Sequence, residues 1–359
     1  MNTVSDRRPM AGSHTAPPGH LLLRYREWSV LVLYRGVLAT LGLTIAMFFV
    51  AGLALALGTA DLNPLTALAA AFGTGTEQDV FIVRELRLPR VVTGILVGMA
   101  LGTGGCLMQT LARNRLATPG IVGIDNGATA FAVASVVALT TGLAPSGMSL
   151  AGSITALVLV LALSGGTGTR GYRFLVVGIG VGAVFGSITN YLLARAPIDS
   201  ANAAYPWTVG SLNARAGGSV ALLAIGLAIT LPVAVFLGRQ LSTMRLSDQV
   251  AQSLGISVRR VRVGTLMVAV TLSALSVAVA GPVGMIALLA PEAARYLAGP
   301  RTVPVLGSAV AGALFTVLAD LAGRTLFAPI EIPVGVITAV VGGPYLLWVL
   351  LRSSSRRII

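Results

Sequence analysis

The feature that most constrains this chain is a series of long apolar runs separated by short polar segments. A helix needs about 20 predominantly apolar residues to cross the hydrocarbon core of a bilayer. The sequence therefore predicts an all-α polytopic membrane protein with about ten transmembrane helices. The ten runs lie at 37–58, 91–112, 120–141, 148–164, 174–194, 219–238, 262–280, 283–298, 303–322 and 333–351.

Composition favours the same environment. A soluble domain carries about 25% charged residues because its surface faces water. Only 10% of these 359 residues are charged, and 55% are hydrophobic. A net charge of +13 would suggest nucleic acid as the partner of a soluble protein. Here the basic residues, all of them arginine, lie between the apolar runs, so we expect membrane lipid and no nucleic acid.

The distribution of arginine predicts the orientation of the chain. Cytoplasmic loops of membrane proteins carry an excess of basic residues, and most arginines fall on one side if the N-terminus is inside. We therefore expect both termini and residues 113–119 in the cytoplasm. The first 20 residues lack the apolar core of a signal peptide. Residues 1–30 are expected to form a disordered cytoplasmic tail ahead of one transmembrane domain over 31–352.

The longest polar segment expected in the cytoplasm is 239–262, "RQLSTMRLSDQVAQSLGISVRRVR". Ser247 is a favourable helix N-cap and Gly255 a favourable stop, which predicts a short helix over 248–254. A second short basic helix is expected to follow from Ser257. Two such helices would form a docking surface, and an ordinary solvated loop is the alternative.

The chain lacks the residue sets of the common enzymes. A phosphate-binding P-loop needs a lysine, and the sequence contains none. Histidine occurs only at His14 and His20 and cysteine only at Cys106, so no zinc site or internal disulfide is expected. We therefore expect a protein that is not an enzyme, binds no metal, and takes its energy from a partner ATPase or an ion gradient.

A gradient-driven carrier usually holds ionisable groups at mid-membrane depth. The candidates are Asp125, which lies near the inner end of its span, and Asp320, which lies four residues before Arg324 as in an ordinary helical ion pair. Neither position favours a proton relay. On the outer side, "RELRLPR" places Arg87 and Arg90 at the mouth of the second span. They either anchor the helix at the interface or form a cationic patch for an external partner.

Several motifs in order resemble one family. The block "RLPRVVTGILVGMALGTGGCLMQTLARNRLATPGIVGIDNGA" is similar to the signature of iron–siderophore and vitamin B12 importer permeases of the FecCD type, the type II ABC import subunits. The resemblance is greatest to the ferric-siderophore branch and its two-permease heterodimers. Further matches are "LGISVRRVR", "AGPVGMIALLAPEAAR", "LADLAGRTL" and "EIPVGVITAVVGGPYL".

The resemblance implies a fold and a set of partners. Ten transmembrane helices per permease would pair with a second permease, two ATPase subunits and a substrate-binding protein in the cytoplasmic (inner) membrane. ATP and Mg would be held by the ATPase, and this chain would bind no cofactor. The implied cargo is a ferric siderophore, with haem or cobalamin as the alternative. A gradient-coupled carrier and an intramembrane enzyme are less favoured rivals.

The resemblance also assigns residues. Arg115 stands where the family has proline, and Glu292 follows Pro291 where the family often has histidine, so Glu292 receives no role. The implied cytoplasmic gate is Asn114, Arg115 and Leu116, with a second constriction at Arg170 and Gly171. The implied path residue is Gln109, and the binding protein would dock on Arg87, Arg90 and Arg324. The implied ATPase-coupling segment, within 239–262, contains Asp248, Gln249, Ser253, Leu254, Gly255, Arg259 and Arg260.

Overall fold

The computed structural model describes residues 19–25, 28–58, 62–137, 144–165, 172–213, 217–299 and 302–354. Nearly all of them are helical, which confirms the all-α class. A hairpin, β1 (His20–Tyr25) and β2 (Trp28–Leu33), precedes the helices. The helices are α1 (Tyr34–Ala56), α2 (Pro64–Ala71), α3 (Glu77–Phe81), η1 (Ile82–Arg87), α4 (Leu88–Ala112), η2 (Pro119–Val122), α5 (Ile124–Val137), α6 (Pro145–Leu163), α7 (Tyr172–Arg195), α8 (Ile198–Ala204), α9 (Pro206–Val209), α10 (Gly217–Met244), α11 (Asp248–Ser253), α12 (Val258–Ala280), α13 (Gly284–Ala298), α14 (Val305–Thr325) and α15 (Val334–Ser354).

Each predicted apolar run coincides with one of the longer helices, α1, α4, α5, α6, α7, α10, α12, α13, α14 or α15. Among the described residues, seven helices are long and apolar enough to cross a membrane, and α5 and the first part of α15 are shorter apolar helices. Helices dominate because a backbone in hydrocarbon must satisfy its own hydrogen bonds. The multi-pass membrane architecture is therefore confirmed.

The expectation of a disordered tail through residue 30 is wrong for the part of it that the structure describes. Strands β1 and β2 pair antiparallel, so that His20 pairs with Leu33 and Tyr25 with Trp28. Valine, tyrosine and tryptophan favour strands, and this stretch is rich in them. Residues 1–18 lie outside the described part of the chain.

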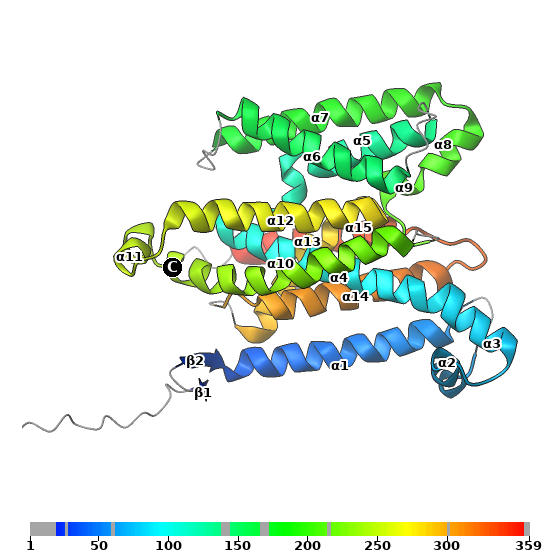
Figure 1. Ribbon diagram of the computed structural model, residues 1–359, viewed down its shortest axis with the longest axis horizontal. Coiled ribbons are helices and arrows are strands. Elements are labelled where there is room, and N and C mark those ends of the chain that lie inside the picture. The colour runs from blue at the N-terminus through cyan, green and yellow to red at the C-terminus, as the bar shows by residue number, and fades with distance from the viewer. Residues whose placement is uncertain are drawn as a thin grey trace, which may run out of the picture.

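Helix α4 lies at the centre of the bundle. It packs against α14, α12, α13 and α10, while α1 covers α14 and α13 from outside. Figure 1 shows α5, α6 and α7 as a separate layer on the other side of α12. The core of the bundle around α4 consists of small and aliphatic side chains such as Val97, Leu272 and Ile286, which are fully buried.

Glycine brings α4 and α14 into direct backbone contact. A Cβ added at Gly98 would overlap the carbonyl of Gly312, and one added at Gly102 would overlap the carbonyl of Ser308. Small residues permit such approach in lipid, where apolar area alone gives little drive for association. The spacing of these glycines is therefore a packing feature that fixes α4 against α14.

The polar connections gather at two ends of the bundle (Figure 1). The α11 end holds the hairpin, residues 113–119, and α11; there Arg35 Nε donates to the carbonyl of Leu297 at 2.7 Å. The α2 end holds α2, α3 and α8. Among the described residues, the segments 113–119 and 239–262, predicted to be cytoplasmic, lie at the α11 end, and residues 62–90, predicted to be outside, lie at the α2 end.

Candidate functional site

The coupling segment begins with a well-formed helix cap. Ser247 Oγ accepts the backbone N–H of Val250 at 3.0 Å, and α11 runs over Asp248–Ser253. Gly255 then turns the chain with a φ of +81°, a conformation that favours glycine. The short helix predicted here is confirmed. The second helix is not short: it is the first turn of α12, because the apolar run continues to Ala280.

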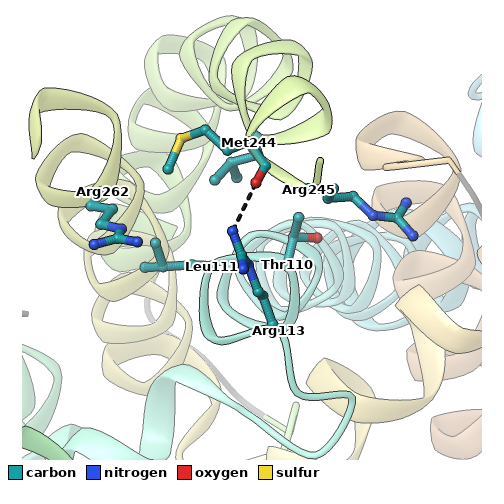
Figure 2. A pocket seen from close by; sticks show the side chains of 7 residues that line it. Thr110, Leu111, Arg113, Met244, Arg245 and Arg262 are labelled. Atoms are coloured by element: carbon teal, nitrogen blue, oxygen red, sulfur yellow. Dashed lines mark hydrogen bonds between the residues drawn. The ribbon is translucent and has the colours of Figure 1, made fainter. Parts of the chain in front are cut away.

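Asp248 connects α11 to its neighbours. Its carboxylate accepts from Arg262 at 2.6 Å and from Arg113 at 3.3 Å. Arg113 also donates to the carbonyl of Met244 at 2.8 Å, the contact drawn in Figure 2. The carboxylate of Asp248 thus ties the end of α4 and the start of α12 to the coupling helix, and Arg113 ties the end of α4 to the end of α10.

The outward face of the coupling segment mixes apolar and cationic groups. Ala251 is fully buried and holds α11 against the bundle, whereas Leu254 is 66% exposed. The other exposed members of the predicted set are Gln249, Ser253, Gly255, Arg259 and Arg260, and Asp248 is half-buried. An exposed patch of leucine and arginine on a capped helix is suited to binding another protein.

The inner loop after α4 is built by Arg113 and Asn114. Arg113 has a left-handed backbone with φ +52°, which ends α4. Asn114 Oδ1 accepts the N–H of Leu116 at 2.9 Å, and the carbonyl of Asn114 accepts from Ala117 at 3.2 Å. Asn114 therefore shapes the turn that presents Arg115 and Leu116 to solvent. Arg170 and Gly171, expected at a second constriction, lie outside the described residues.

Gln109, expected to face the path, is only 3% exposed within this chain. Its side chain lies between α4 and α13, where Nε2 donates to the carbonyl of Leu288 at 3.3 Å and Oε1 accepts from Arg295. Its place on the path stays a prediction. Glu292 received no role in the sequence analysis, yet its carboxylate lies 3.4 Å from both Arg115 Nη1 and Arg295 Nε.

At the α2 end, two of the three arginines expected to dock a partner, Arg87 and Arg324, cap the neighbouring helix α1. Arg87 is 6% exposed and donates to the carbonyls of Leu55 and Ala56, both at 2.7 Å. Arg324 donates to the carbonyl of Ala54 at 3.1 Å. The last carbonyls of a helix have no partner within it, so these guanidinium groups satisfy the end of α1.

A local π-turn positions Arg87. Because Pro89 has no N–H, the regular ladder is interrupted, and Leu88 donates to the carbonyl of Val83, five residues earlier. The η1 segment thereby joins α3 to α4 in one helix over Glu77–Ala112. Such widened turns often occur at functional sites.

Asp320 neutralises two of these arginines. Arg90 lies 3.0 Å and Arg324 3.2 Å from its carboxylate, and Arg90 also contacts Glu331 at 2.8 Å. The side chains of Asp320, Arg324 and Arg90 are 5%, 8% and 13% exposed. The expected exposed cationic patch is therefore wrong for these residues, because a buried carboxylate and helix carbonyls hold them inside. The predicted pair of Asp320 with Arg324 is confirmed.

Asp125 is half-buried, and it accepts a hydrogen bond from Ser273 at 3.3 Å. Within the described residues, no three or more histidine, cysteine or acidic side chains gather as a metal site would require. A multi-pass helical bundle with an exposed leucine and arginine surface at one end and paired charges at the other is compatible with a membrane permease.

Comparison with known proteins identifies which permease class this is. The model of the FecCD transport family matches residues 43–352, and the chain belongs to that family. It is therefore an ABC importer permease subunit, a transporter component and not an enzyme. This class implies ATPase and binding-protein partners.

Individual relatives agree. The chain is 34% identical to the ferric enterobactin transport system permease protein FepG of Escherichia coli, over 90% of this chain and 98% of the relative. It is 34% identical to the hemin transport system permease protein HmuU of Yersinia pestis, over 84% and 93%. A solved structure titled as an inward-facing conformation of a metal-chelate type ABC transporter shares the fold, with a TM-score of 0.75, 22% identity, and coverage of 88% and 99%.

Proposed function

We propose that this chain is the permease subunit that carries a ferric siderophore across the cytoplasmic membrane, with both termini in the cytoplasm. The observation that carries the proposal is the family match over 43–352, together with the relative that transports ferric enterobactin. A second permease, as a heterodimer, completes the path. Partner ATPases hold ATP and Mg, and an external binding protein delivers the cargo.

The coupling segment transmits the motion of the ATPase. The exposed residues of α11 and the first turn of α12 bind the ATPase, and Asp248 links that surface to Arg113 at the end of α4. A movement of α11 therefore displaces the inner loop that carries Asn114, Arg115 and Leu116. ATP can drive this movement only if the conformations differ in their affinity for nucleotide.

The remaining residues serve the two ends of the path. Asn114, Arg115 and Leu116, with Arg170 and Gly171, form the cytoplasmic gate, and Gln109 lies at the inner end of the path. At the α2 end, Arg87, Arg90 and Arg324 position the surface on which the binding protein docks. Glu331, which is 43% exposed, and the arginines behind it make charge steering of that encounter dependent on salt.

Reconstitution in vesicles with the second permease, the ATPase and the binding protein tests the proposal. We expect uptake of ferric siderophore that requires ATP and survives collapse of the proton gradient. Uptake that persists without ATP, or that stops with the gradient while ATP remains, would contradict the ATP-driven mechanism.

Haem is the second candidate cargo, because the hemin permease HmuU is as similar in sequence as the ferric enterobactin permease; cobalamin belongs to the same alternative. Competition for the cognate binding protein separates these cargoes. We expect a ferric siderophore to displace haem and cobalamin. If the binding protein retains haem or cobalamin in the presence of ferric siderophore, haem or cobalamin becomes the favoured cargo and ferric siderophore the alternative.

A further inference from the structure

The inner loop and α13 are joined by a charge network that the function described so far does not use. Glu292 Oε2 lies 3.4 Å from Arg115 Nη1, and Glu292 Oε1 lies 3.4 Å from Arg295 Nε. Arg295 is also bound by Gln109 of α4. A single carboxylate thus contacts two guanidinium groups, one from its own helix and one from the loop.

Burial makes the two halves of this network unequal. The side chains of Glu292 and Arg295 are 8% and 11% exposed, whereas Arg115 is 62% exposed. A buried charge needs a partner, so Glu292 and Arg295 are a fixed pair within α13. The exposed Arg115 side chain can exchange its contact with Glu292 for water at a small cost in free energy. The Arg115–Glu292 contact is therefore the weaker of the two.

The contact joins elements that are far apart in the sequence. Arg115 is in the turn that Asn114 shapes, and that turn follows the end of α4. On its other side the loop is tied through Arg113 to Asp248 and the coupling helix. The loop is therefore held between two carboxylates: Asp248, beside the coupling surface, and Glu292, in α13. The chain departs from the family pattern at both Arg115 and Glu292, and here these two residues pair with each other.

We propose that Arg115 and Glu292 form a latch that holds the inner loop against α13, with Glu292 as the positioning residue. Displacement of α11 pulls the loop through Arg113 and breaks the Arg115–Glu292 contact, while the Glu292–Arg295 pair stays intact. The existence of the latch is a property of the chain, and its part in transport rests on the proposed function.

The distance between two spin labels tests whether the latch exists, in an experiment that does not depend on transport. The labels replace Leu116 in the loop and Tyr296, 79% exposed on α13, in a Cys106→Ala background that removes the only cysteine. The sample is the full chain with its partner permease and ATPase in nanodiscs, without nucleotide or cargo. We expect one dominant distance, and Arg115→Gln should raise the ratio of long to short distances about fivefold, the effect of one half-exposed ion pair.

A double-mutant cycle separates the latch from general loosening. Glu292→Gln combined with Arg115→Gln should give no more opening than Arg115→Gln alone. Arg113→Gln is the matched control, because it removes the same charge from the same loop but its contacts are with Met244 and Asp248. Its effect should add to that of Glu292→Gln. An unchanged distance ratio in Arg115→Gln, or full additivity of the Arg115 and Glu292 variants, would overturn the latch. Because Arg115 is exposed, its variant tests the latch even if the Glu292 variant fails to fold.

Cross-linking tests the role of the latch in transport. Arg115→Cys and Glu292→Cys, in the same background, are joined by a reducible bifunctional thiosulfonate, because side chains of this length place the backbones too far apart for a disulfide. We expect ATP-driven uptake to fall at least tenfold and to return on reduction. Undiminished uptake by the cross-linked complex would remove the latch from the transport cycle. If the complex of the unsubstituted chain shows no ATP-driven uptake, the proposed function fails, whereas the distance result stands.

Discussion

The carboxylate of Asp320 provides the sharpest test of how the α2 end is built. Asp320→Asn keeps the shape of the side chain and removes its charge. If Arg90 and Arg324 serve a structural role, this change should destabilise the chain. An account in which these arginines only receive an external partner expects little effect on stability.

The expected loss of unfolding free energy follows from the contacts of Asp320. Removing one partner of a buried ion pair costs about 3–5 kcal/mol, because it leaves an uncompensated charge. Arg90 keeps Glu331 at 2.8 Å, whereas Arg324 is left with the carbonyl of Ala54 at 3.1 Å. We therefore expect a loss near the lower limit, about 3 kcal/mol. The matched control is Glu331→Gln, whose 43% exposed side chain should contribute at most about 1 kcal/mol.

Reversible unfolding of the purified chain in mixed micelles measures both changes on one scale. Binding-protein affinity of the assembled transporter is measured in parallel. A loss of unfolding free energy below about 1 kcal/mol for Asp320→Asn, or one equal to that of Glu331→Gln, would refute the structural role of this cluster.

Three further variants test other parts of the fold. Gly98→Ala should lower the free energy of unfolding by about 1–3 kcal/mol, because the added methyl group forces α4 away from α14. Gly180→Ala is the control, because a Cβ there meets nothing within 4 Å, and it should be nearly neutral in the same unfolding assay. Equal losses for the two variants would contradict the close α4–α14 contact. Gly255→Ala should lower the free energy of unfolding by about 1–2 kcal/mol, because the φ of +81° at this position is unfavourable for a residue with a Cβ. An unchanged free energy of unfolding would argue against that turn. Asp248→Asn should lower ATP-driven uptake at least about fivefold with a stability change near 1 kcal/mol; normal uptake would remove Asp248 from the coupling route.

The transmembrane helices could be predicted from the sequence because hydrocarbon leaves few alternatives. A run such as 262–280 must satisfy its backbone internally, and the structure has a helix there. The cap at Ser247 and the turn at Gly255 were predictable for a similar reason, because each depends on residues only a few positions away. The pairing of β1 with β2 was missed, since both strands are short and lie in a stretch interpreted as tail.

Apart from Asp320 with Arg324, which are four residues apart, most of the charge contacts described above could not be predicted, because their partners are far apart along the chain. Arg87 is recognisable as an interfacial arginine, but the sequence does not reveal that it reaches the carbonyls of Leu55 and Ala56. The same holds for Arg90 with Asp320, which turns an expected exposed patch into a buried cluster. Glu292 carried one local signal, an acidic residue inside an otherwise apolar run.

The central claim is that this chain is a passive conduit whose motion is driven by a separate ATPase bound at α11. The most direct test compares cargo uptake by the complete reconstituted transporter with uptake by the same transporter lacking residues 248–257, in vesicles containing ATP. We predict ATP-dependent import by the intact complex and none above background after the deletion, with a separate check that the shortened chain still inserts and assembles with the second permease. Import that continues at the intact rate after the deletion, or that proceeds in vesicles without ATP, would contradict this account.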